Sequence, residues 1–182
     1  HAVTFLWRAE GCPEPESTDN PFTDVTEADF YYKAVLWAVE NQITNGLTET
    51  TFGPFALCNR AQVVTFLWRA KGKPEPTSTN HPFKDINSKA FYYKAMLWAV
   101  ENGITAGMSA TTFEPDRTCT RGQVVTFLWR MAGEPEAAVA ENSAIWIYPI
   151  AGSAEPIQVV PGKDFAEKHL FSPKTLAYLD VW

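Results

Sequence analysis

The peptide NRAQVVTFLWRAKG, residues 59–72, recurs almost unchanged as TRGQVVTFLWRMAG, residues 120–133, and a shorter copy, HAVTFLWRAEG, opens the chain at residues 1–11. Val64 and Val125 hold the same place in their copies and stand 61 residues apart, and the first copy keeps this spacing. A fixed period without slippage is typical of an array of one supersecondary unit. We therefore expect three copies of one helix, separated by spacers of equal length.

The repeated peptide has the pattern of a helix that is apolar around much of its circumference. Its apolar residues form two adjacent stripes, Val63, Phe66, Leu67 and Ala70 in one and Val64 and Trp68 in the other. A helix of this kind belongs in the centre of a bundle. We interpret the tryptophans of the three copies as packing residues: Trp7, Trp68 and Trp129.

The ends of this helix carry clear local signals. Asn59 with Gln62, and Thr120 with Gln123, match the capping box, in which each side chain binds the backbone N–H of the other. A glycine follows the helix in all three copies and is suited to the left-handed conformation that often ends a helix: Gly11, Gly72 and Gly133.

The spacers also repeat. FTDVTEADFYYKAVLWAVENQITNG, residues 22–46, matches FKDINSKAFYYKAMLWAVENGITAG, residues 83–107. Apolar residues at intervals of three and four predict a helix over residues 27–41, and Gly46 or Gly107 supplies the tight turn after it. A short loop with proline follows, and we expect the phenylalanine in each loop to be buried.

These signals predict a mainly α fold with pseudo-threefold symmetry, in which a central three-helix bundle carries peripheral helix-loop lobes. We divide the chain into a truncated first motif at residues 1–15, a second motif at 16–76, a third at 77–136 and a C-terminal segment at 137–182. His1 falls at the position of Gln62, so the first motif lacks its lobe, cap and arginine. We expect the chain to be a fragment of a longer protein.

The C-terminal segment does not continue the repeat. Two short apolar runs lie on either side of Gly152-Ser153 and predict two strands: AIWIYPI, residues 144–150, and PIQVVP, residues 156–161. Ser172-Pro173 has the pattern of a helix start. We assign no fold to this segment.

Composition limits the classes of function. The chain is 46% hydrophobic and 20% charged, which indicates a folded protein, and its net charge of −6 argues against binding to nucleic acid. No apolar run is long enough to span a membrane. We expect no metal site and no cofactor, because the histidines are scattered, and we interpret the cysteines as small buried apolar residues: Cys12, Cys58 and Cys119.

The motifs F-x-D-[VI], G-I-T-x-G, F-x-P and T-R-x-Q, in this order, resemble the S-layer homology (SLH) domain, and the resemblance covers about residues 1–133. It implies a spindle of three SLH motifs that attaches bacterial surface proteins non-covalently to a secondary cell-wall polysaccharide, often one with acidic pyruvate groups. It also implies an extracellular location, at the bacterial cell wall or S-layer, and a non-catalytic role.

The resemblance further implies a set of ligand-binding residues in the grooves between motifs. These are the arginines that open the central helices and an aspartate and a glycine of each lobe: Arg60, Arg121, Asp24, Asp85, Gly46 and Gly107. The sequence departs from the family pattern in two ways. Gln62 and Gln123 replace a glutamate, and Gln42 replaces the first glycine of G-I-T.

Physical chemistry supports the arginines as anion-binding residues. An arginine at the first helical position opposes the helix dipole, and a bound carboxylate would reverse that effect. Alternatively, Arg60 and Arg121 cover neighbouring aromatic rings or pair with aspartates. Trp37 and Trp98 could stack on a sugar ring or pack in the core. In FYYKA, residues 30–34 and 91–95, we expect one buried tyrosine and one that faces a groove.

Two other classes of function compete with wall binding. The array could be a protein-interaction or oligomerisation module in which another chain completes the spindle. It could also be a glycosidase that uses paired carboxylates, with these candidates: Asp24, Asp85, Glu40 and Glu101. Glu40 and Glu101 lie near a helix end in solvated positions, so we expect no enzyme.

Overall fold

The computed structural model describes residues 1–135, 145–147 and 157–159, and the chain divides into a unit of residues 1–135 and a unit of residues 136–182. In the second unit, β1 (Ile145–Ile147) pairs antiparallel with β2 (Ile157–Val159). Both strands fall inside the runs predicted as strands. Gly152-Ser153, between the two runs, and the helix start predicted at Ser172-Pro173 lie outside the described residues.

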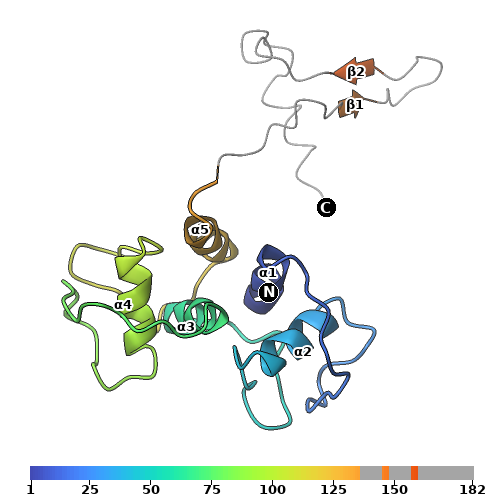
Figure 1. Cartoon of the computed structure of the whole chain (residues 1–182), viewed down its shortest axis with the longest axis horizontal. Helices are drawn as coiled ribbons and strands as arrows, with labels where there is room; N and C mark the ends of the chain where they lie inside the picture. The colour runs from blue at the N-terminus through green and yellow to red at the C-terminus, as the bar shows by residue number, and fades with distance from the viewer. Residues whose placement is uncertain (136–144, 148–156, 160–182) are drawn as a thin grey trace. The chain divides into compact units, whose positions relative to one another are not determined.

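The first unit is helical, as the repeat predicts, and Figure 1 shows how its helices are arranged. In the described part of the chain the helices are α1 (Ala2–Ala9), α2 (Tyr32–Glu40), α3 (Arg60–Ala70), α4 (Tyr93–Glu101) and α5 (Arg121–Met131). The central helix of the repeat is therefore formed three times, as α1, α3 and α5. The spacer helix is formed twice, as α2 and α4.

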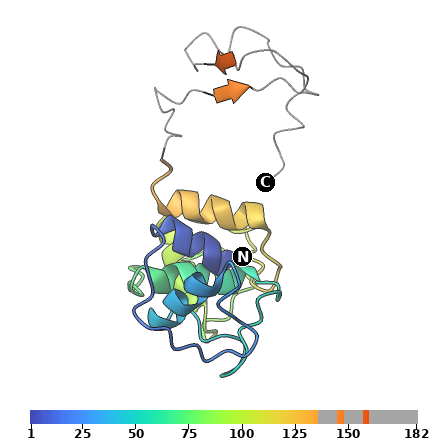
Figure 2. The ribbon, with the colours of Figure 1, turned by 90° about the vertical axis from the view of Figure 1, so that its right-hand side faces the viewer.

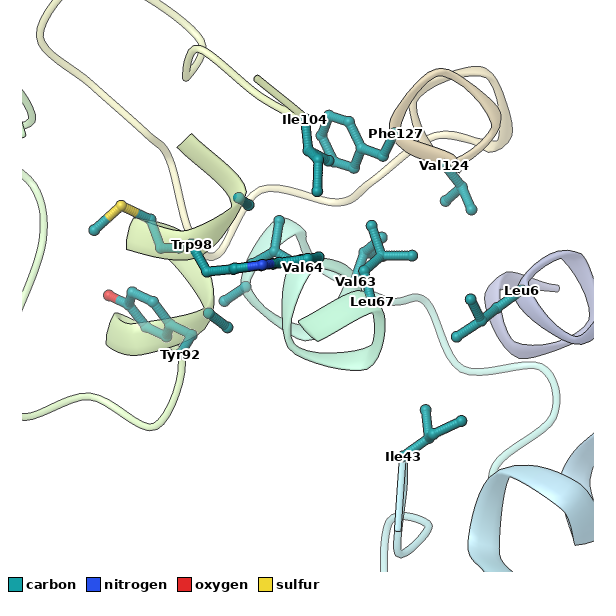
Figure 3. Packing of buried hydrophobic residues seen from close by; sticks show 14 of the residues in the cluster. Leu6, Ile43, Val63, Val64, Leu67, Tyr92, Trp98, Ile104, Val124 and Phe127 are labelled. Atoms are coloured by element: carbon teal, nitrogen blue, oxygen red, sulfur yellow. The ribbon is translucent and has the colours of Figure 1, made fainter. Parts of the chain in front are cut away.

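The three copies of the central helix share one core. Helix α1 contacts both α3 and α5, and Figure 2 shows α1 and α5 side by side. The close-up in Figure 3 shows Leu6 of α1, Leu67 of α3 and Val124 of α5 directed toward one another. Leu6 is 1% exposed and Leu67 2% exposed. The first of the two predicted apolar stripes therefore meets in the middle of this unit. On α5 the second stripe is exposed, with Val125 at 51% and Trp129 at 44%, which corrects the prediction that Trp129 packs.

Each spacer forms a lobe, which we call lobe 2 (residues 16–58) and lobe 3 (residues 77–119). Helix α2 of lobe 2 packs on α1, and α4 of lobe 3 packs on α3. Trp98 of α4 lies against Val64 of α3, as Figure 3 shows. Each lobe therefore rests on the central helix of the motif before it in the sequence.

Each lobe is also tied to the central helix that follows it. Arg69 Nη1 donates to the carbonyl of Ile43 at 3.0 Å, and Arg130 Nη1 donates to that of Ile104 at 3.4 Å. Lobe 2 is thus held between α1 and α3, and lobe 3 between α3 and α5.

The helix predicted over residues 27–41 begins later than expected, at Tyr32, so this boundary was wrong. The carboxylate of Asp29 accepts hydrogen bonds from the N–H of Thr26 at 2.7 Å and from its hydroxyl at 2.9 Å. The N–H of Tyr32 then binds the carbonyl of Asp29 at 2.9 Å. These bonds hold residues 26–31 in turns, because a side chain that binds nearby backbone competes with helix formation.

The predicted start of the central helix is confirmed. Asn59 caps α3 and Thr120 caps α5, each in a complete capping box with the glutamine at the third helical position. Each central tryptophan also anchors the connector after its helix, because its indole N–H donates to a proline carbonyl six residues later. The distances are 2.8 Å for Trp7 to Pro13, 2.8 Å for Trp68 to Pro74 and 3.0 Å for Trp129 to Pro135.

The cysteines only partly match the prediction that they are buried. Cys58 and Cys119 are half-buried against the core, and burial raises the pKa of both thiols. Cys12 is exposed, which corrects the prediction, because it lies in the turn after α1. Within the described ranges, no group of three or more metal-ligating side chains was found, and none of the helices is long and apolar enough to cross a membrane.

The repeat provides its own test of core packing, because Val64 is fully buried on α3 whereas its counterpart Val125 on α5 is 51% exposed. We expect Val64→Ala to lower the free energy of unfolding by about 2 kcal/mol, through lost burial and the cavity left behind. Val125→Ala should change it by less than about 0.5 kcal/mol. Urea unfolding of both variants measures the difference, and equal losses would contradict the packing described.

Candidate functional site

The two arginines predicted to bind a ligand occupy different environments. Arg60 is 2% exposed. Its Nε donates to the carbonyl of Phe113 at 2.9 Å, and its Nη2 donates to the hydroxyl of Thr105 at 3.2 Å. Its guanidinium carbon lies 4.8 Å from the ring centre of Phe113 and 5.4 Å from that of Phe127. This placement favours the alternative in which the arginine covers aromatic rings.

Burial affects the charge of Arg60. Loss of solvent lowers the pKa of its guanidinium, which the nearby carboxylates of Glu114 and Asp85 oppose. Even so, an arginine keeps its charge in a protein. No ion pair joins Arg60 to an aspartate among the residues described, so hydrogen bonds and ring contacts stabilise the buried cation.

The chain ahead of α3 pairs with the loop of lobe 3. The N–H of Arg60 binds the carbonyl of Arg117 at 2.9 Å, and the N–H of Ala61 binds that of Pro115 at 3.0 Å. In return, the N–H of Cys119 binds the carbonyl of Cys58 at 2.9 Å. The first amides of α3 are therefore already used by lobe 3 and are not free to bind an anion.

Arg121, at the start of α5, is exposed. Its guanidinium carbon lies 4.8 Å from the ring centre of Phe5, the same relation that Arg60 has with Phe127 on the next central helix. Its Nη1 is 3.2 Å from Nδ1 of His1. The backbone N–H groups of Arg121 and Gly122 make no hydrogen bond to any residue that the structure describes. This helix start therefore offers both a cation and free amides.

The tryptophans proposed as sugar platforms are buried. Trp37 is 8% and Trp98 7% exposed, which favours core packing, because a ring must be uncovered to stack on a sugar. Two exposed aromatic residues instead occupy the same position in the two lobes, Phe30 at 67% and Phe91 at 64%. The ring centre of Phe30 is 6.5 Å from that of His1, which contacts Arg121.

Sequence analysis did not single out these two phenylalanines. Both are the first residue of FYYKA in their copies, and the predicted helix began before that residue, so they were counted as helical. Of the tyrosines in this motif, Tyr92 is buried, and the other three are half-buried: Tyr31, Tyr32 and Tyr93. The buried tyrosine expected in each copy is therefore present only in lobe 3, as Tyr92, and the prediction was wrong for lobe 2.

The aspartates predicted as ligand residues hold the loops of their own lobes. Asp24 accepts from the N–H groups of Phe52 and Gly53, both at 2.8 Å, and Asp85 does the same for Phe113 and Glu114. Burial opposes ionisation of both carboxyls, but the backbone N–H groups hold their pKa below the ordinary value. Both aspartates are therefore charged loop anchors.

The glycines serve the same loops. Gly46 has φ +79°, and a Cβ there would lie 2.6 Å from Cε1 of Phe22 and 2.8 Å from the carbonyl oxygen of Thr51. Gly107 has φ +85°, and its close neighbours are the corresponding residues of lobe 3, Phe83 and Thr112. Only glycine fits this combination of left-handed backbone and close approach. The left-handed turn predicted at both positions is confirmed.

Glu40 and Glu101, considered as catalytic carboxylates, bind the connector of their own motif. Glu40 accepts from the N–H groups of residues 16 and 17, and Glu101 from those of residues 77 and 78. A hydrogen bond from the hydroxyl of Thr77 and these backbone bonds lower the pKa of Glu101. Their observed contacts are structural.

Comparison with known proteins gives the family. The model of the S-layer homology domain matches residues 21–64 and 82–125. The first match runs from residue 21, ahead of α2, into α3, and the second from residue 82, ahead of α4, into α5. Each therefore contains one lobe and the start of the central helix that carries the arginine.

Three curated relatives are similar over larger parts of the chain. An endoglucanase of Bacillus sp. (strain KSM-635) is 32% identical over 64% of the chain, and a surface-layer 125 kDa protein of Lysinibacillus sphaericus is 31% identical over 81%. A cell surface protein of Thermoanaerobacter kivui is 26% identical over 87%. The matched regions are 12%, 13% and 20% of these relatives.

The different environments of the two arginines predict different effects on stability. Arg60→Ala should lower the free energy of unfolding by about 3 kcal/mol, because it removes two buried hydrogen bonds and leaves a cavity. Arg121→Ala should change it by less than about 0.5 kcal/mol, because its side chain is exposed. Urea unfolding monitored by circular dichroism compares the variants. Similar losses for both would show that the burial of Arg60 is not what stabilises this unit.

Proposed function

The chain belongs to the S-layer homology domain family, and from this premise we propose that it attaches a surface protein non-covalently to the bacterial cell wall. The ligand that we propose is a secondary cell-wall polysaccharide with acidic groups such as pyruvate ketals. Support comes from the family match to both complete motifs and from the surface-layer and cell-surface proteins among the relatives. We place the protein outside the cell, at the wall or S-layer.

The observation that carries the polysaccharide part of the proposal is the start of α5. The exposed guanidinium of Arg121 and the free N–H groups of residues 121 and 122 can donate to one carboxylate. Charge-assisted bonds of this kind are stronger than neutral ones. Phe30 offers an exposed ring close to His1, on which an apolar sugar face can pack.

We further propose that this region is a binding module and not an enzyme. The four carboxylates considered for catalysis all accept hydrogen bonds from backbone N–H groups of their own motif. An acid and a base for glycoside hydrolysis must instead face a substrate from two sides. The endoglucanase among the relatives matches over 12% of its length, so its printed activity is not transferred to this chain.

A cell-wall pull-down tests the proposed function. Purified walls that keep their secondary polymer should retain the chain, and walls stripped of this polymer should not. Arg121→Ala should weaken binding ten-fold or more, because about 1.5–3 kcal/mol of charge-assisted bonding is lost. The matched control is Arg117→Ala, which removes another exposed arginine close to α5. Retention that does not depend on the polymer, or equal binding by both variants, would overturn the proposal.

One observation favours a second function, the oligomerisation module. On α5, Val125 is 51% and Trp129 44% exposed, whereas the corresponding valine of α3 is fully buried by α4. Apolar side chains that are buried in one copy and exposed in another suit a protein interface.

Sedimentation equilibrium tests this second function. If α5 forms an interface between copies, the chain should have the mass of a dimer at about 100 μM, and Val125→Asp should return it to the monomer, because a charge is not tolerated in an apolar interface. A monomer at every concentration would remove this candidate.

A further inference from the structure

Two cysteines of adjacent motifs lie opposite each other where α3 meets lobe 3. Cys58 and Cys119 hold the same position in their repeats. Next to them, Asn59 and Thr118 form an isolated antiparallel bridge, and the N–H of Cys119 donates to the carbonyl of Cys58 at 2.9 Å. In this register Cys58 is paired with Cys119, one step along from the bridge. The pairing of the two motifs therefore aligns their cysteines.

The geometry of such a pair suits a disulfide bond. Directly opposite residues in an antiparallel, hydrogen-bonded pair have Cα atoms about 5.5 Å apart, and their side chains lie on the same face. Disulfides join residues whose Cα atoms are about 4.4–6.8 Å apart. Both cysteines are free thiols, pack against the same core cluster and are only half-buried. The two sulfur atoms therefore share one face and are within reach of a small reagent.

A buried cation lies near one of the thiols. Burial raises the pKa of Cys119, and the charge of Arg60 opposes this shift. A charge on Cys58 raises the pKa of Cys119 further, as expected for two thiols that lie close together. The thiolate is the form of cysteine that attacks a disulfide. Cys119 is therefore suited to react first, because the guanidinium of Arg60 stabilises its charged form.

We propose that Cys58 and Cys119 are a redox-active pair that closes to an intramolecular disulfide between α3 and lobe 3. The oxidant is a small-molecule disulfide of the glutathione type. The Cys119 thiolate attacks one sulfur of this molecule, forms a mixed disulfide and displaces one small thiol. The Cys58 thiol loses its proton, attacks the sulfur of Cys119 and displaces the second small thiol. The protein thus loses two electrons and two protons, and the oxidant is reduced to two thiols.

The bond closes a covalent loop around α3 and lobe 3, from residue 58 to residue 119. A disulfide that closes a long loop restricts the unfolded chain strongly and so favours the folded state. The bond also fixes the register in which Arg60 reaches its partners Phe113 and Thr105. Disulfides persist outside the cell, which is the location proposed above. Oxidation therefore converts a hydrogen-bonded contact between two motifs into a covalent one.

Glutathione redox buffers test the pair in the full chain carrying Cys12→Ser, a change that removes the exposed third thiol. The measurements are the mass of the intact chain, the peptide map under non-reducing conditions and the melting temperature. None of them uses a wall polymer, so the result is independent of the proposed function. The matched controls add Cys58→Ser or Cys119→Ser to the same background.

We expect the oxidised chain to be lighter by two hydrogen atoms, to carry no glutathione and to yield one peptide that links residues 58 and 119. It should melt about 5 °C or more above its reduced form. Each control should instead hold glutathione on its remaining thiol and gain no such increase. Glutathione on both cysteines without an internal bond would overturn the proposal.

A second measurement separates a bond that the fold favours from one that forms by chance. In one set of glutathione buffers, the equilibrium constant for the internal disulfide should be at least ten-fold larger in the folded chain than in the same chain unfolded in urea. Folding and bond formation favour each other to the same extent, because they are linked equilibria. Equal constants in the folded and unfolded chains would show that the fold does not align the two thiols, and would overturn the proposal.

Discussion

The buried guanidinium of Arg60 is the constraint on which the arrangement of the two complete motifs depends. A charge in an apolar setting must be hydrogen-bonded, and here the partners all belong to the next motif. The arginine therefore fixes where α3 lies relative to lobe 3, and the backbone pairing of Cys58 with Cys119 follows the same register. Because lobe 3 also packs on α3 and is tied to α5, one side chain links three elements of the unit.

The sequence was sufficient for the features that local chemistry decides. The period, the capping boxes and the left-handed glycines are written in short stretches of sequence, and each is present as predicted. The start of α2 was missed because Asp29 diverts the backbone into turns before the helix. The burial of Arg60 could not be predicted in the same way, because its partners lie 45 and 53 residues away and belong to another motif. Phe30 and Phe91 were overlooked because the predicted helix included them, whereas α2 and α4 begin two residues later.

Identical residues at identical repeat positions differ here in what surrounds them. Arg60 is enclosed by lobe 3, whereas Arg121 is exposed with free backbone amides beside it. Val64 and Val125 show the same contrast. A role assigned from a family motif therefore describes a position in the repeat, and the neighbouring motif decides whether that position packs or binds. This is why ligand binding is assigned more readily to Arg121 than to Arg60.

The hydrogen bond from each central tryptophan to a proline six residues later bears on how the domain carries load. A pull on the chain beyond Pro135 reaches α5 first, at the point where the indole of Trp129 holds that proline carbonyl. The pull then acts on a helix that packs against α1 and is joined to lobe 3 by the hydrogen bond from Arg130 to Ile104. The side-chain contacts along this helix share the pulling force, because they lie on one rigid element. Such a pull would have to disrupt the packing of α5 before it reached lobe 2.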